Sequence, residues 1–425
     1  MAKSIDSPSY YTATTPAPPS YPSLPGDIET DVCIVGAGYT GLSAALELAE
    51  AGYRVVVLEA RTVGYGASGR NGGQICTGFS PGQEKIEAQL GQADARKCFD
   101  LAEESKALLK DRIARHAIDC DLRWGYLSVI PKAHQMDYLR GWKEELDSVG
   151  YTDTAVLTKA ELAEKLESRA YHGALRDGGA GHLQPLKYCL GLARAAVAAG
   201  ATIHEQSHVL GIETHPVPSA RTANGTVRAK FMIVAGNAYL GRTVPKLYGR
   251  VMPVASYIIA TEPLGENRAR ALIRDGEAVA NTNFIVDYFR LTGDTRLLFG
   301  GRASYSTLEP ANLGAYMRPR MTAVFPQLRD AKIDYAWGGY IAITANRIPD
   351  CGRLAPNVFY AHGYSGQGVA LAGFYGKLMG EAIRGTAERF DLLARVKHAT
   401  FPGGPIRTPM LVAAMMYYRL RDMLS

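Results

Sequence analysis

The sequence contains no block of like charge, although its formal net charge is +6 over 425 residues. Lys and Arg are spread along the whole chain, so the weak basicity predicts a solvated surface and no nucleic-acid partner. The chain also lacks a C-x-x-C pair and any Cys and His at zinc-ligand spacing, and we expect no metal site. Its six widely spaced cysteines are typical of reduced thiols in a cytosolic protein.

Long apolar runs are missing as well. The first 30 residues hold Ser, Thr, Tyr and Pro without the apolar stretch of a signal peptide. No run approaches the ~20 apolar residues that a membrane helix needs. We therefore expect a soluble, cytoplasmic protein without a membrane span, and the sequence leaves its oligomeric state open.

A strand, a glycine turn and a helix follow one another from Asp31. The apolar run 31–35 predicts a parallel strand buried on both faces, 42–50 has helical apolar spacing, and 54–59 predicts the next strand. The intervening G-x-G-x-x-G lets the backbone turn tightly and approach a pyrophosphate, and lets helix and strand pack closely. The cofactor-binding residues expected in this turn are Gly36, Gly38, Tyr39, Thr40 and Gly41.

Glu59 ends the second of these strands, 18 residues after Gly41. A carboxylate at this position accepts hydrogen bonds from both hydroxyls of an adenosine ribose. It would also repel a 2′-phosphate, which argues against NADP and leaves NAD or FAD. Ala60 and Arg61 follow directly, and we place them in the same site.

A second glycine-rich loop, 64–74, favours FAD over NAD. It is too polar and too rich in glycine for a core, and its backbone N–H groups and polar side chains suit the pyrophosphate and the flavin end of a long cofactor. NAD domains need no second loop at this position. The cofactor-binding residues expected here are Ala67, Ser68, Gly69, Arg70, Asn71, Gly72, Gly73 and Gln74.

A third segment, 358–373, repeats the pattern of a strand, a glycine loop and a helix. A helix N-terminus aimed at a reduced flavin would stabilise the negative charge near its N1 atom. The residues expected to line the cofactor here, and at the predicted strands near 209–213 and 231–235, are Val209, Ala235, Gly236, Gly363, Tyr364, Ser365, Gly366, Gln367, Gly368 and Val369.

These segments predict an α/β fold in which a Rossmann-type FAD-binding domain is interleaved with a sheet-rich α+β substrate domain. We expect helical regions at 84–117 and 132–165, and a hairpin joining 284–291 to 296–299. The predicted division is an extended arm at 1–26, an FAD-binding domain at 27–83, 181–245 and 346–425, and a substrate domain at 84–180 and 246–345.

Together the motifs resemble the D-amino-acid oxidase superfamily of flavoenzymes. The residues that carry this resemblance are Gly36–Gly41, Glu59, Ala67–Gly73, Trp337–Gly339, Thr344, Pro349-Asp350 and Gly363–Gly368. Within the superfamily, the chain most resembles gamma-glutamylputrescine oxidoreductases. That likeness rests on the Tyr- and Pro-rich arm and on Asn237–Tyr239, Thr261–Leu264, Leu298–Gly301, Ala361–Gly368 and Phe401–Gly404.

The resemblance implies oxidation of a small-molecule amine, the terminal amine of gamma-glutamylputrescine or a similar N-substituted diamine. The imine would hydrolyse to an aldehyde, and O2 would be reduced to hydrogen peroxide. Some members of the superfamily bind flavin covalently, but this chain has Ile341–Ile343 before Thr344 and Gly66 rather than His before Ala67, so we expect non-covalent FAD. Two alternatives stay open: a D-amino-acid or secondary-amine dehydrogenase with another acceptor, and a flavoprotein whose FAD is structural or serves an electron-transfer partner.

Hydride transfer needs a neutral amine, whereas a free alkylamine has a pKa of about 10.4. An apolar, aromatic pocket removes the proton by desolvation, without a strong base. The candidate catalytic residues are Tyr257, Tyr288, Trp337 and His362, and the candidate substrate residues are Arg302 and Tyr340. Each has a plainer interpretation: sheet packing for the aromatic residues, a structural hydrogen bond for His362, and surface exposure for Arg302.

Overall fold

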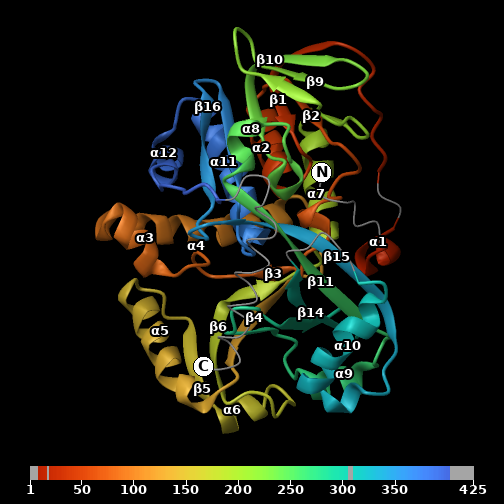
Figure 1. The fold of residues 1–425 in the computed structure, drawn as a ribbon, viewed down its shortest axis with the longest axis vertical. Helices are drawn as coiled ribbons and strands as arrows, with labels where there is room; N and C mark the ends of the chain where they lie inside the picture. The colour runs from red at the N-terminus through yellow and green to blue at the C-terminus, as the bar shows by residue number, and fades with distance from the viewer. Residues whose placement is uncertain (1–7, 17–18, 305–309, 403–425) are drawn as a thin grey trace.

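The computed structural model describes residues 8–16, 19–304 and 310–402, and for residues 302–304 it describes the backbone alone. Residues 403–425 of the predicted FAD-binding domain lie outside the described residues. The strands form two sheets, one in the upper half and one in the lower half of Figure 1. The predicted α/β class with a Rossmann-type sheet and a second sheet is confirmed.

The first sheet is built on parallel strands in the order β17-β10-β1-β2-β7. Val32 and Ile34 of β1 pack in one core while Cys33 and Val35 pack in another, as expected of a strand buried on both faces. The strands of this sheet, with its antiparallel edges β16, β8 and β9, are β1 (Ile28–Val35), β2 (Val55–Leu58), β7 (Thr202–His204), β8 (Gly211–Glu213), β9 (Ser219–Arg221), β10 (Thr226–Val234), β16 (Asp350–Ala355) and β17 (Val358–His362).

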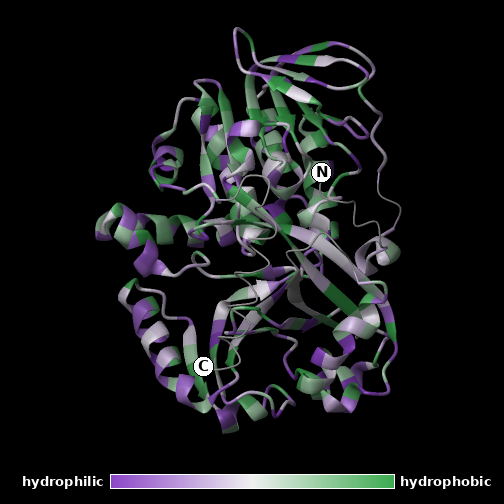
Figure 2. Cartoon of the chain, viewed as in Figure 1, coloured by the Kyte–Doolittle hydropathy of each residue, from purple (hydrophilic) through white to green (hydrophobic). Residues whose placement is uncertain are grey.

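Three helices pack together beside this sheet. They are α2 (Tyr39–Glu50), α7 (Pro185–Ala198) and α11 (Gly368–Ile383), with α2 in contact with both of the others. Figure 2 shows that this region is coloured mostly hydrophobic, in strands and helices alike. The remaining helices near the first sheet are α3 (Gln83–Leu90), α4 (Gln92–Arg115), α8 (Pro245–Tyr248) and α12 (Glu388–Ala394).

The second sheet is mostly antiparallel and runs in the order β15-β11-β14-β13-β12-β4-β6-β3, with β5 paired to β6. Its strands are β3 (Gln74–Ile75), β4 (Arg123–Ile130), β5 (Thr154–Thr158), β6 (Gly173–His182), β11 (Val251–Thr261), β12 (Ala278–Asn281), β13 (Tyr288–Leu291), β14 (Leu297–Ser304) and β15 (Ile333–Thr344). The predicted hairpin exists as β13 and β14, although its first strand begins at Tyr288. The helices of this half are α5 (Met136–Ser148), α6 (Lys159–Ala163), α9 (Glu266–Leu272) and α10 (Leu313–Val324).

Two local predictions need correction. The region 132–165 is not helical throughout, because Thr154–Thr158 forms β5 and pairs with β6. A short run rich in β-branched residues at a sheet edge favours a strand over a helix. The arm is not extended throughout either, since Tyr10–Thr14 forms the short helix α1, capped by Ser9.

The division into domains stays a proposal. The segments 27–83, 181–245 and 346–402 supply every strand of the first sheet, but Gln74–Ile75 pairs with β6 of the second sheet.

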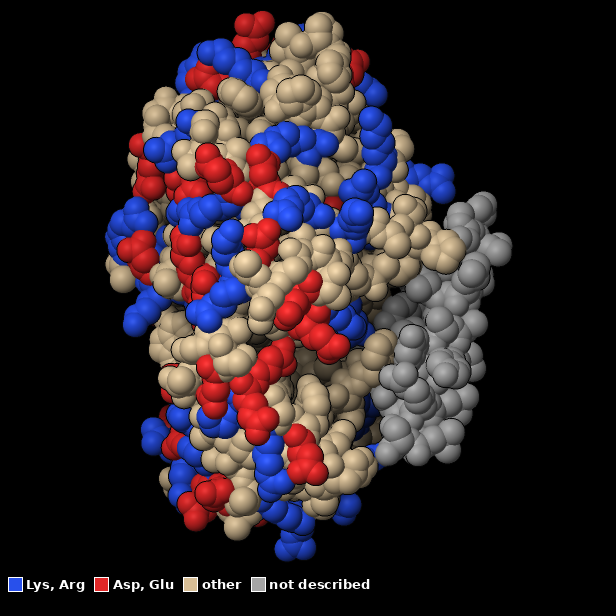
Figure 3. All heavy atoms as spheres, turned by 90° about the vertical axis from the view of Figure 1, so that its left-hand side faces the viewer, with Lys and Arg blue, Asp and Glu red and all other residues tan. Residues whose placement is uncertain are grey.

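Figure 3 shows Lys and Arg interspersed with Asp and Glu over the face that it presents. Within the described residues, no helix is both long enough and apolar enough to span a membrane.

His182, at the end of β6, gives the fold a testable dependence on pH. Its side chain is 1% exposed, its Nε2 lies 2.9 Å from the Gly276 carbonyl oxygen, and burial lowers its pKa from 6.5 to about 3. In the unfolded chain His182 therefore binds a proton as the pH falls below 6.5. In the folded protein the same residue stays neutral down to about pH 3. The free energy of unfolding should fall by about 2 kcal/mol from this residue between pH 7.5 and pH 5.

Urea unfolding at the two pH values checks this prediction. His182→Gln keeps an N–H for the Gly276 carbonyl but removes the titrating group, so the variant should lose about 2 kcal/mol less on acidification. An equal loss in variant and native protein would contradict the prediction.

Candidate functional site

The first glycine turn leaves β1 and starts α2 with almost no space for side chains. A Cβ at Gly36 would lie 2.9 Å from the carbonyl oxygen of Ala235, and one at Gly41 would overlap the carbonyl oxygen of Gly36. Gly36 also has a φ of +108°. Gly38 at the N-cap has no side chain to cap α2. The N-terminal N–H groups of the helix other than that of Tyr39, which Ser68 binds, therefore remain suited to an anion.

Glu59 lies directly beside this turn, where β2 ends. Its Oε2 accepts a hydrogen bond of 2.9 Å from the N–H of Ala37, and its Oε1 accepts one of 3.0 Å from the N–H of Arg61. Burial raises the pKa of Glu59, and these two backbone bonds only partly oppose the effect. Each carboxylate oxygen keeps a further acceptor position, as the binding of two ribose hydroxyls requires.

The second loop is bound to the start of α2. Ser68 Oγ accepts a hydrogen bond of 3.0 Å from the N–H of Tyr39, and a Cβ at Gly38 would come within 2.8 Å of that oxygen. Asn71 braces the loop from inside: its Nδ2 donates to Ala67 O at 2.8 Å and its Oδ1 accepts from Gly73 N at 2.7 Å. The first two predicted motifs therefore form one continuous surface.

Gln74 has a different environment from the rest of its loop. Its Nε2 donates to the carbonyl of Val279 at 3.0 Å, and its Oε1 accepts from Tyr126 at 3.3 Å. These contacts tie Gln74 to the second sheet, as its place in β3 requires. Its predicted cofactor contact stays a prediction.

The third loop, 363–368, reaches the same place from β17. Tyr364 and Thr40 share a hydrogen bond of 2.7 Å between their hydroxyl groups, and the N–H of Gly363 donates to Asn237 Oδ1 at 3.0 Å. The start of α11 has no side-chain cap, and Oε1 of Gln367 is buried without a partner among the described residues. An uncapped N-terminus and an unsatisfied acceptor here suit a polar ligand group.

The remaining predicted residues complete the edge where the parallel strands end. The N–H of Ala235 bonds to Val35 O at 2.8 Å, and Gly236 begins the segment that holds Asn237. Val209 is buried in the core on one side of β1 and β2. Glycine-lined loops, a ribose-type carboxylate and two helix N-termini without a cap from their own N-cap side chains fit an elongated dinucleotide, and these residues would hold it.

The candidate aromatic residues lie on opposite faces of the second sheet. Trp337 is directly opposite Ile258 on the neighbouring strand and packs in the large core beside the glycine loops, where its Nε1 donates to Arg70 O at 3.0 Å. Tyr288 lies on this side too, since a Cβ at Gly72 would come within 2.6 Å of its ring. Both residues are therefore placed beside the predicted flavin loop.

Tyr257 and Tyr340 point to the other face. Tyr257 is 1% exposed, and its ring packs edge-on against Tyr316 of α10. Tyr340 packs against Tyr239, whose hydroxyl accepts a hydrogen bond of 3.2 Å from the Tyr340 N–H. Strand alternation explains the separation, because residues an odd number apart face opposite ways. For these two tyrosines, sheet packing is the role that the structure displays.

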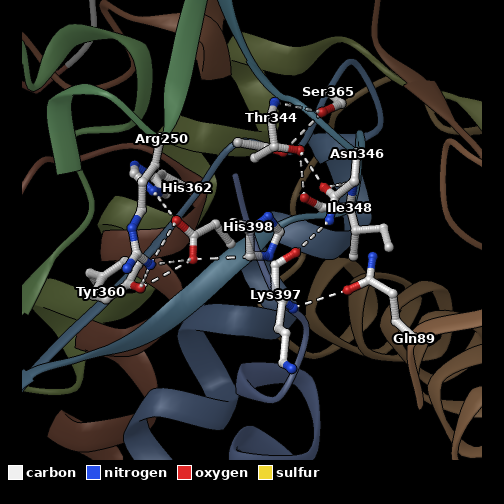
Figure 4. Close-up of polar contacts among 12 residues, drawn as sticks. Gln89, Arg250, Thr344, Asn346, Ile348, Tyr360, His362, Ser365, Lys397 and His398 are labelled. Atoms are coloured by element: carbon white, nitrogen blue, oxygen red, sulfur yellow. Dashed lines mark hydrogen bonds and ion pairs between the residues drawn. The ribbon is translucent and has the colours of Figure 1, made fainter. Parts of the chain in front are cut away.

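His362 belongs to a buried ionic network shown in Figure 4. Its Nε2 donates to Asp350 Oδ2 at 2.9 Å, while Arg250, Tyr360 and His398 approach the same carboxylate at 3.3, 3.1 and 4.0 Å. Burial alone would raise the pKa of Asp350, but the hydrogen bond from His362 and the surrounding positive charges lower it. His362 is thus oriented by Asp350, and its catalytic role stays a prediction.

One predicted site residue lies outside the described residues, and two residues of the site were not predicted from the sequence. The side chain of Arg302 lies outside the described residues. Asn237 and Asp350 appear in the motifs, but their side-chain roles need the fold. The partner of Asn237 is 126 residues away, and Asp350 meets His362 only through the pairing of β16 with β17. For Asn237, the available signal was a polar residue directly after a predicted strand end.

Known proteins resemble this chain along almost its whole length. A family model described as "DAO: FAD dependent oxidoreductase" matches residues 31–382. A gamma-glutamylputrescine oxidoreductase from Escherichia coli is 43% identical over 420 residues, 98% of each chain. A probable oxidoreductase OrdL from Haemophilus influenzae is 40% identical over 97% of each chain. The crystal structure of glycine oxidase from Geobacillus kaustophilus has a TM-score of 0.72 at 24% identity, covers 84% of this chain and 95% of its own, and shares the fold.

Replacing the carboxylate beside the first turn tests the ribose assignment. Glu59→Arg puts a positive charge and a longer side chain where the ribose hydroxyls would bind, so the purified variant should contain less than about a tenth of the native FAD. The ratio of flavin absorbance to protein absorbance measures this content. Glu87→Arg makes the same charge change on the exposed face of α3 and should keep its FAD. Full FAD content in Glu59→Arg would disprove the assignment.

Proposed function

The chain belongs to the DAO family of FAD-dependent oxidoreductases, and we propose that it oxidises the terminal amine of gamma-glutamylputrescine or a similar N-substituted diamine. FAD-dependent oxidation is the chemistry that the family model describes, and the gamma-glutamylputrescine relative is the support for an amine as the group oxidised. The sequence match to that relative covers both sheets, and this full-length match is the observation that carries the proposal.

In the proposed reaction, the carbon beside the amine loses a hydride and the nitrogen loses a proton, which gives an imine. Water then hydrolyses the imine to an aldehyde and ammonia. Molecular oxygen is the proposed acceptor of the two electrons, and with two protons it leaves as hydrogen peroxide. When bound, FAD supplies the two-electron acceptor that the side chains of a protein cannot provide.

The protein would contribute a suitable environment to this reaction. Tyr288, which is partly exposed, offers aromatic surface beside the 67–74 loop, where desolvation would favour the neutral amine, and the fully buried Trp337 supports that loop through Arg70. The uncapped N-terminus of α11 would stabilise negative charge that accumulates on the cofactor. Asp350 would keep His362 in one orientation behind the third loop.

Anaerobic titration tests the substrate and the acceptor separately. Gamma-glutamylputrescine should bleach the oxidised flavin absorbance, and admitting air should restore it with one hydrogen peroxide formed per flavin. Putrescine, which lacks the glutamyl group, should bleach the flavin at least about tenfold more slowly, because it forfeits the binding energy of that group.

The other outcomes are equally informative. Recovery that requires a quinone or a dye would replace oxygen as the acceptor and favour a dehydrogenase. Bleaching by D-amino acids or sarcosine but not by gamma-glutamylputrescine would refute the proposed substrate. A flavin that no amine bleaches would favour a structural or electron-transfer role for FAD.

We also propose that FAD is held without a covalent bond. A Cβ at Gly66 would lie 3.1 Å from the Tyr239 ring, so a larger side chain has little room at this position. Acid precipitation should therefore release all the flavin into the supernatant. Yellow colour that stays in the washed pellet would contradict this prediction.

The cytoplasmic location expected from the sequence stays a prediction.

A further inference from the structure

Three successive backbone carbonyls of the second loop each accept a hydrogen bond, and the three donor side chains contact one another. Arg70 O accepts from Trp337 Nε1 at 3.0 Å, Asn71 O accepts from the Tyr11 hydroxyl at 2.8 Å, and Gly72 O accepts from Arg290 Nε at 2.7 Å. One donor comes from β15, one from β13 and one from the N-terminal arm. The loop is therefore held by three elements that are far apart in the chain.

These bonds fix the direction of the opposite side of each peptide. In a trans peptide the N–H points away from the carbonyl of the same plane. Carbonyls turned toward Trp337 and Tyr11 therefore turn the N–H groups of Asn71 and Gly72 away from these two side chains. The next N–H, that of Gly73, is already bound by Asn71 Oδ1 at 2.7 Å.

Tyr11 is well suited to hold such a contact. It is fully buried, and its ring packs edge-on against Trp337 with the centroids 5.2 Å apart. Arg290 Nη2 donates to its hydroxyl oxygen at 3.2 Å, so that hydroxyl must use its own proton for Asn71 O. Burial raises the pKa of Tyr11 despite the Arg290 charge, which keeps the hydroxyl protonated.

Arg290 reinforces the same arrangement. It is 2% exposed, and within the described ranges its guanidinium is hydrogen-bonded to the oxygens of Gly72, Leu291 and Tyr11 rather than to a carboxylate. A buried cation needs these acceptors, so each oxygen is costly to withdraw. The arm thus takes part in a buried hydrogen-bond network that includes the loop.

We propose that Tyr11 is a positioning residue, through which the N-terminal arm aims the Asn71 and Gly72 amides at FAD. The proposal rests on the assignment of the 67–74 loop to the FAD site. The matched family model begins at residue 31, so the arm is an addition to the matched region rather than part of it. Cofactor affinity would then depend on an element outside the family's common domain.

Tyr10 supplies a matched control on the same helix. Its hydroxyl donates to Asp294 Oδ1 at 2.6 Å, and its ring packs against Tyr335, away from the glycine loops. Tyr10→Phe and Tyr11→Phe each remove one buried hydroxyl from α1 and leave the ring in place. Only Tyr11→Phe releases a carbonyl of the loop.

The test is titration of the full-length apoprotein with FAD and, separately, with AMP, which reports on the adenosine end alone. Tyr11→Phe should raise the Kd for FAD about three- to tenfold and leave the Kd for AMP unchanged, because one hydroxyl hydrogen bond is lost at the loop. Tyr10→Phe should leave both values within about twofold of the native protein.

Two results would overturn the proposal. One is an unchanged Kd for FAD in Tyr11→Phe, and the other is an equal rise for FAD and AMP, which indicates general destabilisation. Asn71→Ala separates this failure from failure of the loop assignment. If Asn71→Ala also binds FAD normally, the loop does not hold the cofactor; if it binds weakly while Tyr11→Phe is normal, only the role of the arm is wrong.

Discussion

The close approach of backbone to backbone at Gly41 sets where everything else in the site lies. With no Cβ there, α2 begins against the carbonyl of Gly36, at the end of the central strand. From that fixed start, the N–H of Tyr39 reaches Ser68 and the hydroxyl of Thr40 reaches Tyr364. A larger residue at position 41 would move the helix, and with it the contacts that hold the second and third loops.

The second constraint is the burial of charge between the two sheets. Asp350 and Arg290 are almost fully buried, and neither is satisfied by neighbours in sequence alone. Asp350 gathers Arg250, His362 and His398 around the end of β17, while Arg290 gathers Gly72 and Tyr11 around the second loop. Because an unpaired buried charge is expensive, these contacts lock the interleaved segments in one arrangement.

The predictions that succeeded depend on local sequence patterns. Those that failed depend on which distant segment a residue packs against, and the sequence does not reveal that. The strand–turn–helix motif at 31–50 predicts its own structure because its apolar run and glycines act over a few residues. Thr154–Thr158 became a strand because β6 offers an edge, which its own sequence cannot reveal. Tyr257 and Trp337 both read as pocket aromatics, yet sheet register puts them on opposite faces.

The sequence by itself determined the Rossmann-type sheet, the FAD cofactor class, the family of FAD-dependent oxidoreductases and the glycine loops expected to bind the cofactor. These depend on residue types at short, fixed spacings, where glycine and a carboxylate have few substitutes. Only the tertiary structure decided which aromatic residues face those loops, which group orients His362, and that Tyr11 of the arm reaches Asn71. Such contacts join residues on different strands or segments, so their geometry exists only once those elements have packed together.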